Sequence, residues 1–256
     1  MKKAKLIFLI PALFSITACG LGQEVSPLQA ENIADNMVVE NPKNMEMRLT
    51  GTEKSDDSSY KIDYMFKKNE DKEIYGKLNI SSSKDSQNVK LELYICNNDD
   101  YGKVAYAKVY DSSSNTTQVE VITYKNNSST FNNEINPVLD QLDAVTDQYY
   151  LDVDDLKTAV TSYNDQSNKD SNLTVKYYSK GDNNLSIQAT YKSTSDSDYS
   201  MSGSVTITFD KGCLTSFNQS VKYNLGGTSY SDNYKCTIKY PSSLKITLPR
   251  GWKNYL

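Results

Sequence analysis

The side chains that could do chemistry in this chain are carboxylates, tyrosines and cysteines, because its 256 residues include no histidine. Without histidine there is no Ser-His-Asp or Cys-His catalysis, no histidine general base and no histidine-ligated zinc. The sequence also lacks the G-x-S-x-G, Walker and G-x-G-x-x-G patterns. These absences favour a protein that is not an enzyme and that carries no cofactor.

Acidic side chains are the remaining candidates for metal binding and hydrolysis. Asp152, Asp154 and Asp155 are clustered as calcium ligands often are, but the segment lacks the Gly and the distal Glu of an EF-hand loop. The N-terminus of a helix attracts carboxylates in the same way, so we predict helix capping and no metal site. Two of the 32 Asp and Glu residues meeting in a cleft could still hydrolyse a glycosidic bond. A carboxylate-based hydrolase therefore stays an alternative.

The four cysteines are Cys19, Cys96, Cys213 and Cys236. A hairpin through Gly226-Gly227 would place Cys213 roughly 13 Å beyond the position that Cys236 pairs with. A disulfide needs Cα atoms within about 7 Å, so we predict that Cys213 and Cys236 are buried free thiols.

The N-terminus combines a basic start with a short apolar stretch. Lys2, Lys3 and Lys5 precede Leu6–Ile16, which is too short to span a bilayer as a helix. The stretch ends in Ile16-Thr17-Ala18-Cys19-Gly20, which resembles the lipobox of bacterial lipoproteins. The resemblance implies a signal peptide over 1–18, a diacylglycerol on Cys19, a tether over 19–27 and a location on the outer face of the cytoplasmic membrane. The alternative is an ordinary secretory signal with a chance cysteine.

The charge of the chain bears on its partners. The net charge is −4, and loss of the three N-terminal lysines leaves 25 basic and 32 acidic residues, or −7. An acidic chain is not typical of a nucleic-acid binder, and electrostatics would not hold it on an anionic membrane. The predicted partner is therefore the membrane, through the two acyl chains on Cys19. Trp252, in a basic tail, either sits at the membrane interface or closes one end of the sheet.

The elements that must position these residues are mostly strands. Ser26-Pro27 predicts a helix start, alternation with period two runs from Met45 to Tyr124, and helices begin at Asn136 and at Asp152 or Asp154. A polar loop follows at 164–171, and strands resume from Leu173 to Tyr240. We predict a mainly β (α+β) fold, a curved antiparallel sheet of about eleven strands forming a partly open barrel, with about three short helices. We favour a single domain over 28–256; two domains split at the helices are the alternative.

The predicted sheet has more apolar side chains on its inner face than three short helices can cover. Such a face must curl on itself, pack on another sheet or hold a ligand. We predict an apolar cavity, with a tightly closed core as the alternative. The candidate ligand-lining residues share the inner parity: Tyr64, Leu78, Leu93, Tyr191, Met201, Val205 and Phe217.

An acylated cysteine, a short helix and two meanders around a helical insertion resemble the lipoprotein-carrier superfamily, which includes mycobacterial lipid-binding lipoproteins. The segment Ser202–Phe217 and the ending Ile246-Thr-Leu-Pro249 resemble those of Gram-positive members. The resemblance implies a half-barrel that binds acyl chains on its concave face, and it assigns no individual contact residue. We therefore predict a non-enzymatic lipoprotein that binds or carries a lipid or lipidated molecule. The alternatives are a surface adhesin or structural lipoprotein with a closed core and the hydrolase above.

Overall fold

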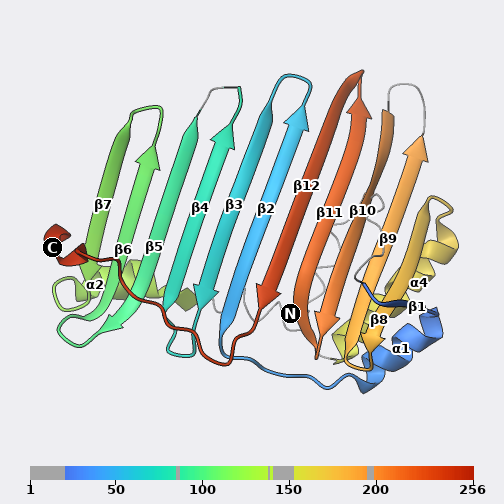
Figure 1. Ribbon diagram of the computed structural model, residues 1–256, viewed down its shortest axis with the longest axis horizontal. Helices are drawn as coiled ribbons and strands as arrows, with labels where there is room; N and C mark the ends of the chain where they lie inside the picture. The colour runs from blue at the N-terminus through green and yellow to red at the C-terminus, as the bar shows by residue number, and fades with distance from the viewer. Residues whose placement is uncertain (1–20, 85–86, 138, 141–152, 195–198) are drawn as a thin grey trace. The chain divides into compact units, whose positions relative to one another are not determined.

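The computed structural model describes residues 21–84, 87–137, 139–140, 153–194 and 199–256 (Figure 1). The signal peptide predicted over 1–18 and Cys19 lie outside these residues. The described part is mainly β, with antiparallel strand pairs, as the alternation predicted. β1 pairs with β8 and β7 pairs with β6, and neither has a second partner strand within the described ranges, so the sheet is not closed into a barrel.

The described residues form twelve strands and five helical segments. The strands are β1 (Gln23–Val25), β2 (Met45–Ser55), β3 (Ser59–Lys68), β4 (Ile74–Ser82), β5 (Asn88–Asn98), β6 (Gly102–Asp111), β7 (Thr116–Thr123), β8 (Leu173–Gly181), β9 (Asn184–Thr194), β10 (Tyr199–Asp210), β11 (Cys213–Leu225) and β12 (Thr228–Lys239). The helical segments are α1 (Pro27–Asn36), α2 (Ser128–Thr130), the π-helix η1 (Phe131–Ile135), α4 (Val153–Lys169) and the 3-10 helix η2 (Trp252–Tyr255).

The chain divides into two compact units. Unit 1 comprises Met1–Asn41, Thr52–Asp57 and Tyr150–Cys236. Unit 2 comprises Pro42–Gly51, Ser58–Tyr149 and Thr237–Leu256. The single domain over 28–256 stays a prediction, and each unit is described by itself.

Unit 2 is built on the meander β3 to β7, whose strands follow one another in Figure 1. Its first turn is held by the side chain of Asn69. The Asn69 Oδ1 atom accepts from the Glu73 N–H at 2.9 Å, and Asn69 Nδ2 donates to Glu73 Oε2 at 2.8 Å. Lys72, with φ 58°, reverses the chain. Asn69 to Lys72 therefore form the turn between β3 and β4.

One end of the unit 2 sheet is buried on both faces. On one face Trp252 packs on Val104 and Tyr106, and its ring lies 5.6 Å from that of Tyr101. Trp252 is only 9% exposed, so in the structure it closes this end of the sheet. The segment of α2 and η1, with its buried Phe131, lies at the same ends of β5 to β7 (Figure 1).

The helical insertion differs from the prediction at both ends. Helical turns begin at Ser128, eight residues before the predicted Asn136, because the apolar anchor is Phe131, whose ring meets that of Tyr124 at 5.9 Å. Most of the predicted second helix lies outside the described residues. The predicted loop at 164–171 is wrong up to Lys169, because α4 continues through it.

Tertiary contacts explain the length of α4. The Tyr177 hydroxyl donates to Asn164 Oδ1 at 2.8 Å and lies 3.2 Å from the Val160 carbonyl oxygen. Asn164 Nδ2 also donates to Glu31 Oε1. These bonds tie the polar end of the helix to the sheet and to α1. The loop was predicted from the polar composition of this segment, but polar side chains such as Asn164 bond to the sheet and to α1 and allow the helix to continue.

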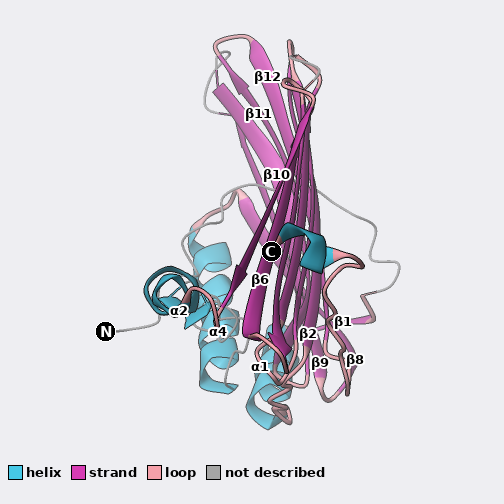
Figure 2. Cartoon of the chain, turned by 90° about the vertical axis from the view of Figure 1, so that its left-hand side faces the viewer, coloured by secondary structure: helices cyan, strands magenta, loops and turns pink. Residues whose placement is uncertain are grey.

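Unit 1 packs α1 and α4 together on one side of its strands (Figure 2). The Ser26 side chain accepts from the Gln29 N–H, and Gln29 Oε1 accepts from the Ser26 N–H, so the predicted helix start is a capping box. The core between helices and strands consists of Ala30, Ala34, Met37, Leu156, Val160, Tyr177, Leu185, Ile187 and Phe209.

The segment assigned to a tether is partly ordered. Gln23 to Val25 form β1, which pairs with Tyr177 to Ser179 of β8. Three residues are too few to show a period, so the sequence could not indicate this strand. Among the described helices, none has the length and apolarity to cross a bilayer.

Candidate functional site

The strand register gathers the apolar side chains of unit 2 on one face of β3 to β6. Tyr64 lies opposite Leu78, Leu78 opposite Leu91, and Leu91 opposite Val109. Leu93 lies one pair along, opposite Gly76 and Ala107. Three of the predicted ligand-lining residues, Tyr64, Leu78 and Leu93, therefore share this face, which we call the apolar face. Its members are Ile62, Tyr64, Phe66, Ile74, Leu78, Ile80, Val89, Leu91, Leu93, Ile95, Ala105, Ala107 and Val109.

Burial falls steadily along the apolar face. At one end, Ile74 is 2% exposed and Ile95 is 3% exposed. At the other end, Ile80 and Val89 are 36% and 37% exposed, although they lie directly opposite each other. Between them the side chains are half-buried. We call Ile62, Tyr64, Leu78, Ile80, Val89 and Leu91 the open end of the apolar face.

The middle of the apolar face carries little bulk. A Cβ atom added at Gly76 would meet only the Leu93 Cβ, at 3.9 Å, among the described atoms. Ala107, on the far side of Leu93, adds a single methyl group. Exposed apolar side chains that lie next to one another on a sheet, as Ile80 and Val89 do, are typical of a surface that contacts an apolar partner.

The other predicted ligand-lining residues lie in unit 1. Met201 lies opposite Tyr223, and Phe217 lies opposite Ile207, so with Val205 they share one face. Tyr191 and Met201 pack on Val221 in a small cluster. Val205 is 1% exposed, which places it in the packing of the unit. A ligand contact by these four residues stays a prediction.

A carboxylate and tyrosine cluster lies in unit 1. The Tyr234 hydroxyl donates to Glu53 Oε1. Burial, and then the charge of Glu53, raises the pKa of Asp232 above its ordinary value. The Tyr223 and Tyr230 rings stack at 4.8 Å with an angle of 8°. Sequence reasoning missed Glu53 and Asp232 as a pair, because nothing in their spacing indicates that they meet.

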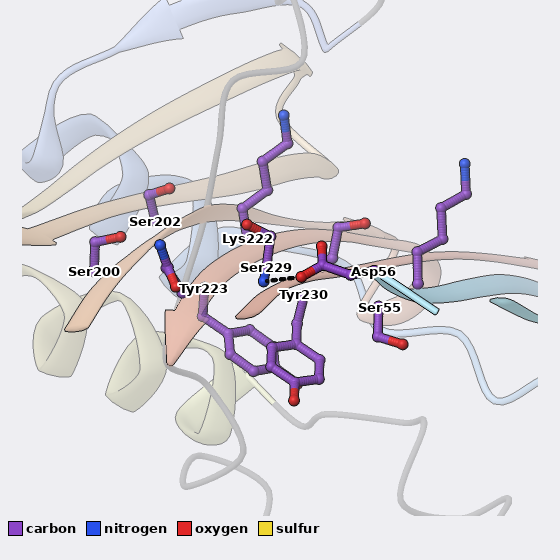
Figure 3. A pocket seen from close by; sticks show the side chains of 11 residues that line it. Ser55, Asp56, Ser200, Ser202, Lys222, Tyr223, Ser229 and Tyr230 are labelled. Carbon is purple, nitrogen blue, oxygen red and sulfur yellow. Dashed lines mark hydrogen bonds between the residues drawn. The ribbon is translucent and has the colours of Figure 1, made fainter. Parts of the chain in front are cut away.

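A polar pocket of about 450 Å³ lies near the same strand ends (Figure 3). The Ser229 N–H donates to Asp56 Oδ2 at 3.2 Å, and Lys222 stands on the side opposite the rings of Tyr223 and Tyr230. Asn224 Oδ1 is buried and has no hydrogen-bond partner among the described atoms. The lining is Lys54, Ser55, Asp56, Ser200, Ser202, Lys222, Tyr223, Asn224, Ser229, Tyr230 and Ser231. Its amines and hydroxyls suit a hydroxylated or anionic group and not an acyl chain.

The described cysteines are inert. Cys96, Cys213 and Cys236 are buried and free, which confirms the predicted thiols of Cys213 and Cys236. Burial raises the pKa of Cys213 and of Cys236 to about 11, and that of Cys96 to about 12. A thiol with such a pKa is a poor nucleophile at neutral pH. Within the described ranges, no three acidic or cysteine side chains are grouped to hold a metal ion.

Comparison with known proteins gives a distant structural similarity only. The sequence matches no protein-family model and no curated protein. A DUF1329 family protein from Desulfovibrio piger is 10% identical, over 86% of this chain and 96% of that chain, with a TM-score of 0.24. A β-barrel-like protein of the domain of unknown function DUF1849 from Brucella abortus is 5% identical, over 80% and 100%, with a TM-score of 0.21. At these TM-scores the likeness carries no argument about function.

Proposed function

We propose that this chain is a non-enzymatic lipoprotein, anchored through Cys19 on the outer face of the cytoplasmic membrane, that binds the acyl chain of a lipid or lipidated molecule. The bound chain lies on the open end of the apolar face of unit 2. The observation that carries this proposal is the exposure of Ile80 and Val89, 36% and 37%, in a continuous apolar patch on four strands.

The chemistry of the patch supports an acyl chain as the occupant. The side chains of the open end are aliphatic except for Tyr64, and the register places no charged residue between them on β3, β4 and β5. Apart from the Tyr64 hydroxyl, such a surface offers dispersion contacts and no hydrogen-bonding groups on its side chains, which suits a saturated chain. Each buried methylene of that chain contributes about 0.8 kcal/mol.

Binding is tested with a fluorescent fatty acid and the chain from Leu21 onward. The double variant Ile80→Asn, Val89→Asn places two amides on the open end, and we expect its affinity to fall about tenfold or more, because a buried unpaired amide costs about 1–3 kcal/mol. The matched control is Leu225→Asn in unit 1, a leucine that is 57% exposed. Its affinity should equal that of the unchanged chain.

Two results would contradict the acyl-chain proposal. One is absence of any bound apolar molecule in native mass spectra together with no binding of the fatty acid. The other is equal loss of affinity in the Leu225 control. The lipid anchor is tested separately, by incorporation of labelled palmitate into the full chain and its loss in Cys19→Ala.

The carboxylate cluster of unit 1 favours hydrolysis as a second candidate function. A carboxyl group with a raised pKa, as burial and Glu53 give Asp232, is what a general acid needs, and a second carboxylate faces it. This candidate requires that Asp232→Asn abolish turnover of a glycoside substrate. A screen of aryl glycosides in which the unchanged chain shows no turnover would remove it.

A further inference from the structure

The opposite face of the unit 2 sheet carries lysines. Lys61, Lys77, Lys90 and Lys108 come from four successive strands, β3 to β6. The register places Lys77 and Lys108 on either side of Glu92, and Lys90 between Asn79 and Tyr110. All four point away from the apolar face, because residues alternate between the two faces of a strand. We call these four residues the lysine face.

The lysine face has more positive than negative charge. Lys77 Nζ lies 3.2 Å from Glu92, and Asp63, on the same face, is paired with Arg48 at 3.2 Å. Lys61, Lys90 and Lys108 form no ion pair within the described part of the chain. Lys90 instead lies 5.7 Å from the centre of the Tyr110 ring. Three exposed ammonium groups are therefore left without a carboxylate on a chain whose total charge is −4.

The geometry of the lysine face suits a layer of phosphate groups. Adjacent strands lie about 4.8 Å apart, so the four ammonium groups are spread over one face of the sheet and do not converge on a deep cavity. A shallow pocket of about 280 Å³ on this face is lined by Lys77, Asn79, Lys90, Glu92, Lys108, Tyr110 and Thr117. Its one carboxylate, Glu92, is paired with Lys77, so the amines of Lys90 and Lys108 give the pocket its positive charge. A headgroup phosphate fits such a pocket, and neighbouring headgroups would meet the surrounding lysines.

We infer that the lysine face docks on the anionic headgroups of the membrane to which the chain is anchored. This inference rests on the proposed anchoring through Cys19. Charge complementarity selects the occupant, because clustered lysines next to a bilayer are attracted to anionic lipids and not to zwitterionic ones. The net charge of the chain hides this attraction, since acidic residues elsewhere outweigh the lysine face.

The inference is tested on the full lipidated chain in two kinds of vesicle, phosphatidylcholine alone and phosphatidylcholine with phosphatidylglycerol. Acetylation rates of individual lysines are read by mass spectrometry. In the anionic vesicles, Lys61, Lys90 and Lys108 should react about fivefold more slowly. The difference should vanish at about 1 M salt, where the screening length is about 3 Å. Lys222 of unit 1 is the internal control and should react equally in both.

A matched pair of variants separates docking from a general charge effect. Lys90→Glu with Lys108→Glu should remove the protection of Lys61, whereas Lys54→Glu with Lys222→Glu in unit 1 should keep it. Equal rates in the two vesicles, or protection that salt leaves unchanged, would overturn the inference. Failure to float with phosphatidylcholine vesicles would overturn only the lipid anchor, because the unlipidated chain added to anionic vesicles gives the same lysine readout.

Discussion

The two units treat the apolar face of their strands differently. In unit 1, α1 and α4 pack on the strands, and Leu156, Val160 and Tyr177 are at most 1% exposed. In unit 2, the same alternating pattern ends in the open end, where Ile80 and Val89 are more than a third exposed. Period-two alternation therefore predicts which side chains share a face, and the covering elements determine which of them become core.

The two units also differ in the charges beside their apolar side chains. Unit 1 carries Glu53 and Asp232 next to the stacked tyrosines. Unit 2 has no carboxylate on β3 to β5 of its apolar face, where Lys68 lies opposite the buried Ile74, and it carries lysines on the opposite face. A surface without carboxylates suits an acyl chain, and a surface with them does not. This difference favours unit 2 as the site of the proposed ligand.

We expect the largest loss of stability from a substitution in the core of unit 1, where helices cover the strands. Leu156→Ala in α4 removes a side chain that is 1% exposed in the core of unit 1. We expect a loss of about 2–5 kcal/mol of unfolding free energy, because the cavity cannot be filled by rigid neighbours. Urea denaturation followed by circular dichroism measures it. A loss below about 1 kcal/mol would mean that α4 does not cover the strands.

A smaller effect is expected from the start of the covering helix. Ser26→Ala removes one half of the capping box of α1 and leaves the Gln29 N–H without its acceptor. The unfolding free energy should fall by about 1 kcal/mol. The conservative control Ser26→Thr keeps the hydroxyl and should recover most of the loss. If alanine and threonine were equal, the cap would not stabilise unit 1.

The sequence predicted the strands well because their evidence is local. Alternation placed Tyr64, Leu78 and Leu93 on one face, and the register confirms it. The start of α1 was also readable, from Ser26-Pro27. Both features depend on neighbouring residues, whose spacing is fixed by the geometry of the element itself.

What the sequence could not predict depends on contacts between distant segments. The extent of α4 depends on Tyr177 reaching Asn164, and the carboxylate cluster depends on Glu53 meeting Asp232 and Tyr234. The lysine face was missed for the same reason. A net charge adds all residues together, and only the strand register shows that Lys90 and Lys108 are neighbours.

Alanine substitution of two isoleucines on the apolar face of unit 2 tests the difference between covered and open strands directly. Ile80→Ala, at the open end, should cost about 1 kcal/mol or less, because the side chain is already exposed and only strand propensity is lost. Ile95→Ala, at the buried end, should cost about 2–5 kcal/mol. Urea titration of both variants decides it. Equal losses would show that the open end is covered, and the acyl-chain proposal would lose its basis.

The smallest effect concerns Asp232 and depends on pH. Burial and the charge of Glu53 raise its pKa, so the native state binds the proton of Asp232 more tightly than the unfolded chain does. The contribution of this group is therefore present below its unfolded pKa and is lost as the pH rises through the raised, native pKa. The asparagine in Asp232→Asn cannot ionise, so the variant does not lose this stability as the pH rises.

The variant should accordingly melt about 1–3 °C higher than the unchanged chain at pH 7, and at the same temperature near pH 3. Differential scanning calorimetry across this range measures how the difference in melting temperature grows with pH. Asp63→Asn is the opposite control, because it removes a carboxylate paired with Arg48 and should not raise the melting temperature at pH 7. If the difference in melting temperature between Asp232→Asn and the unchanged chain did not depend on pH, the pKa of Asp232 would not be raised in the native state. The difference in charge that we describe between the two units would then have no support from Asp232.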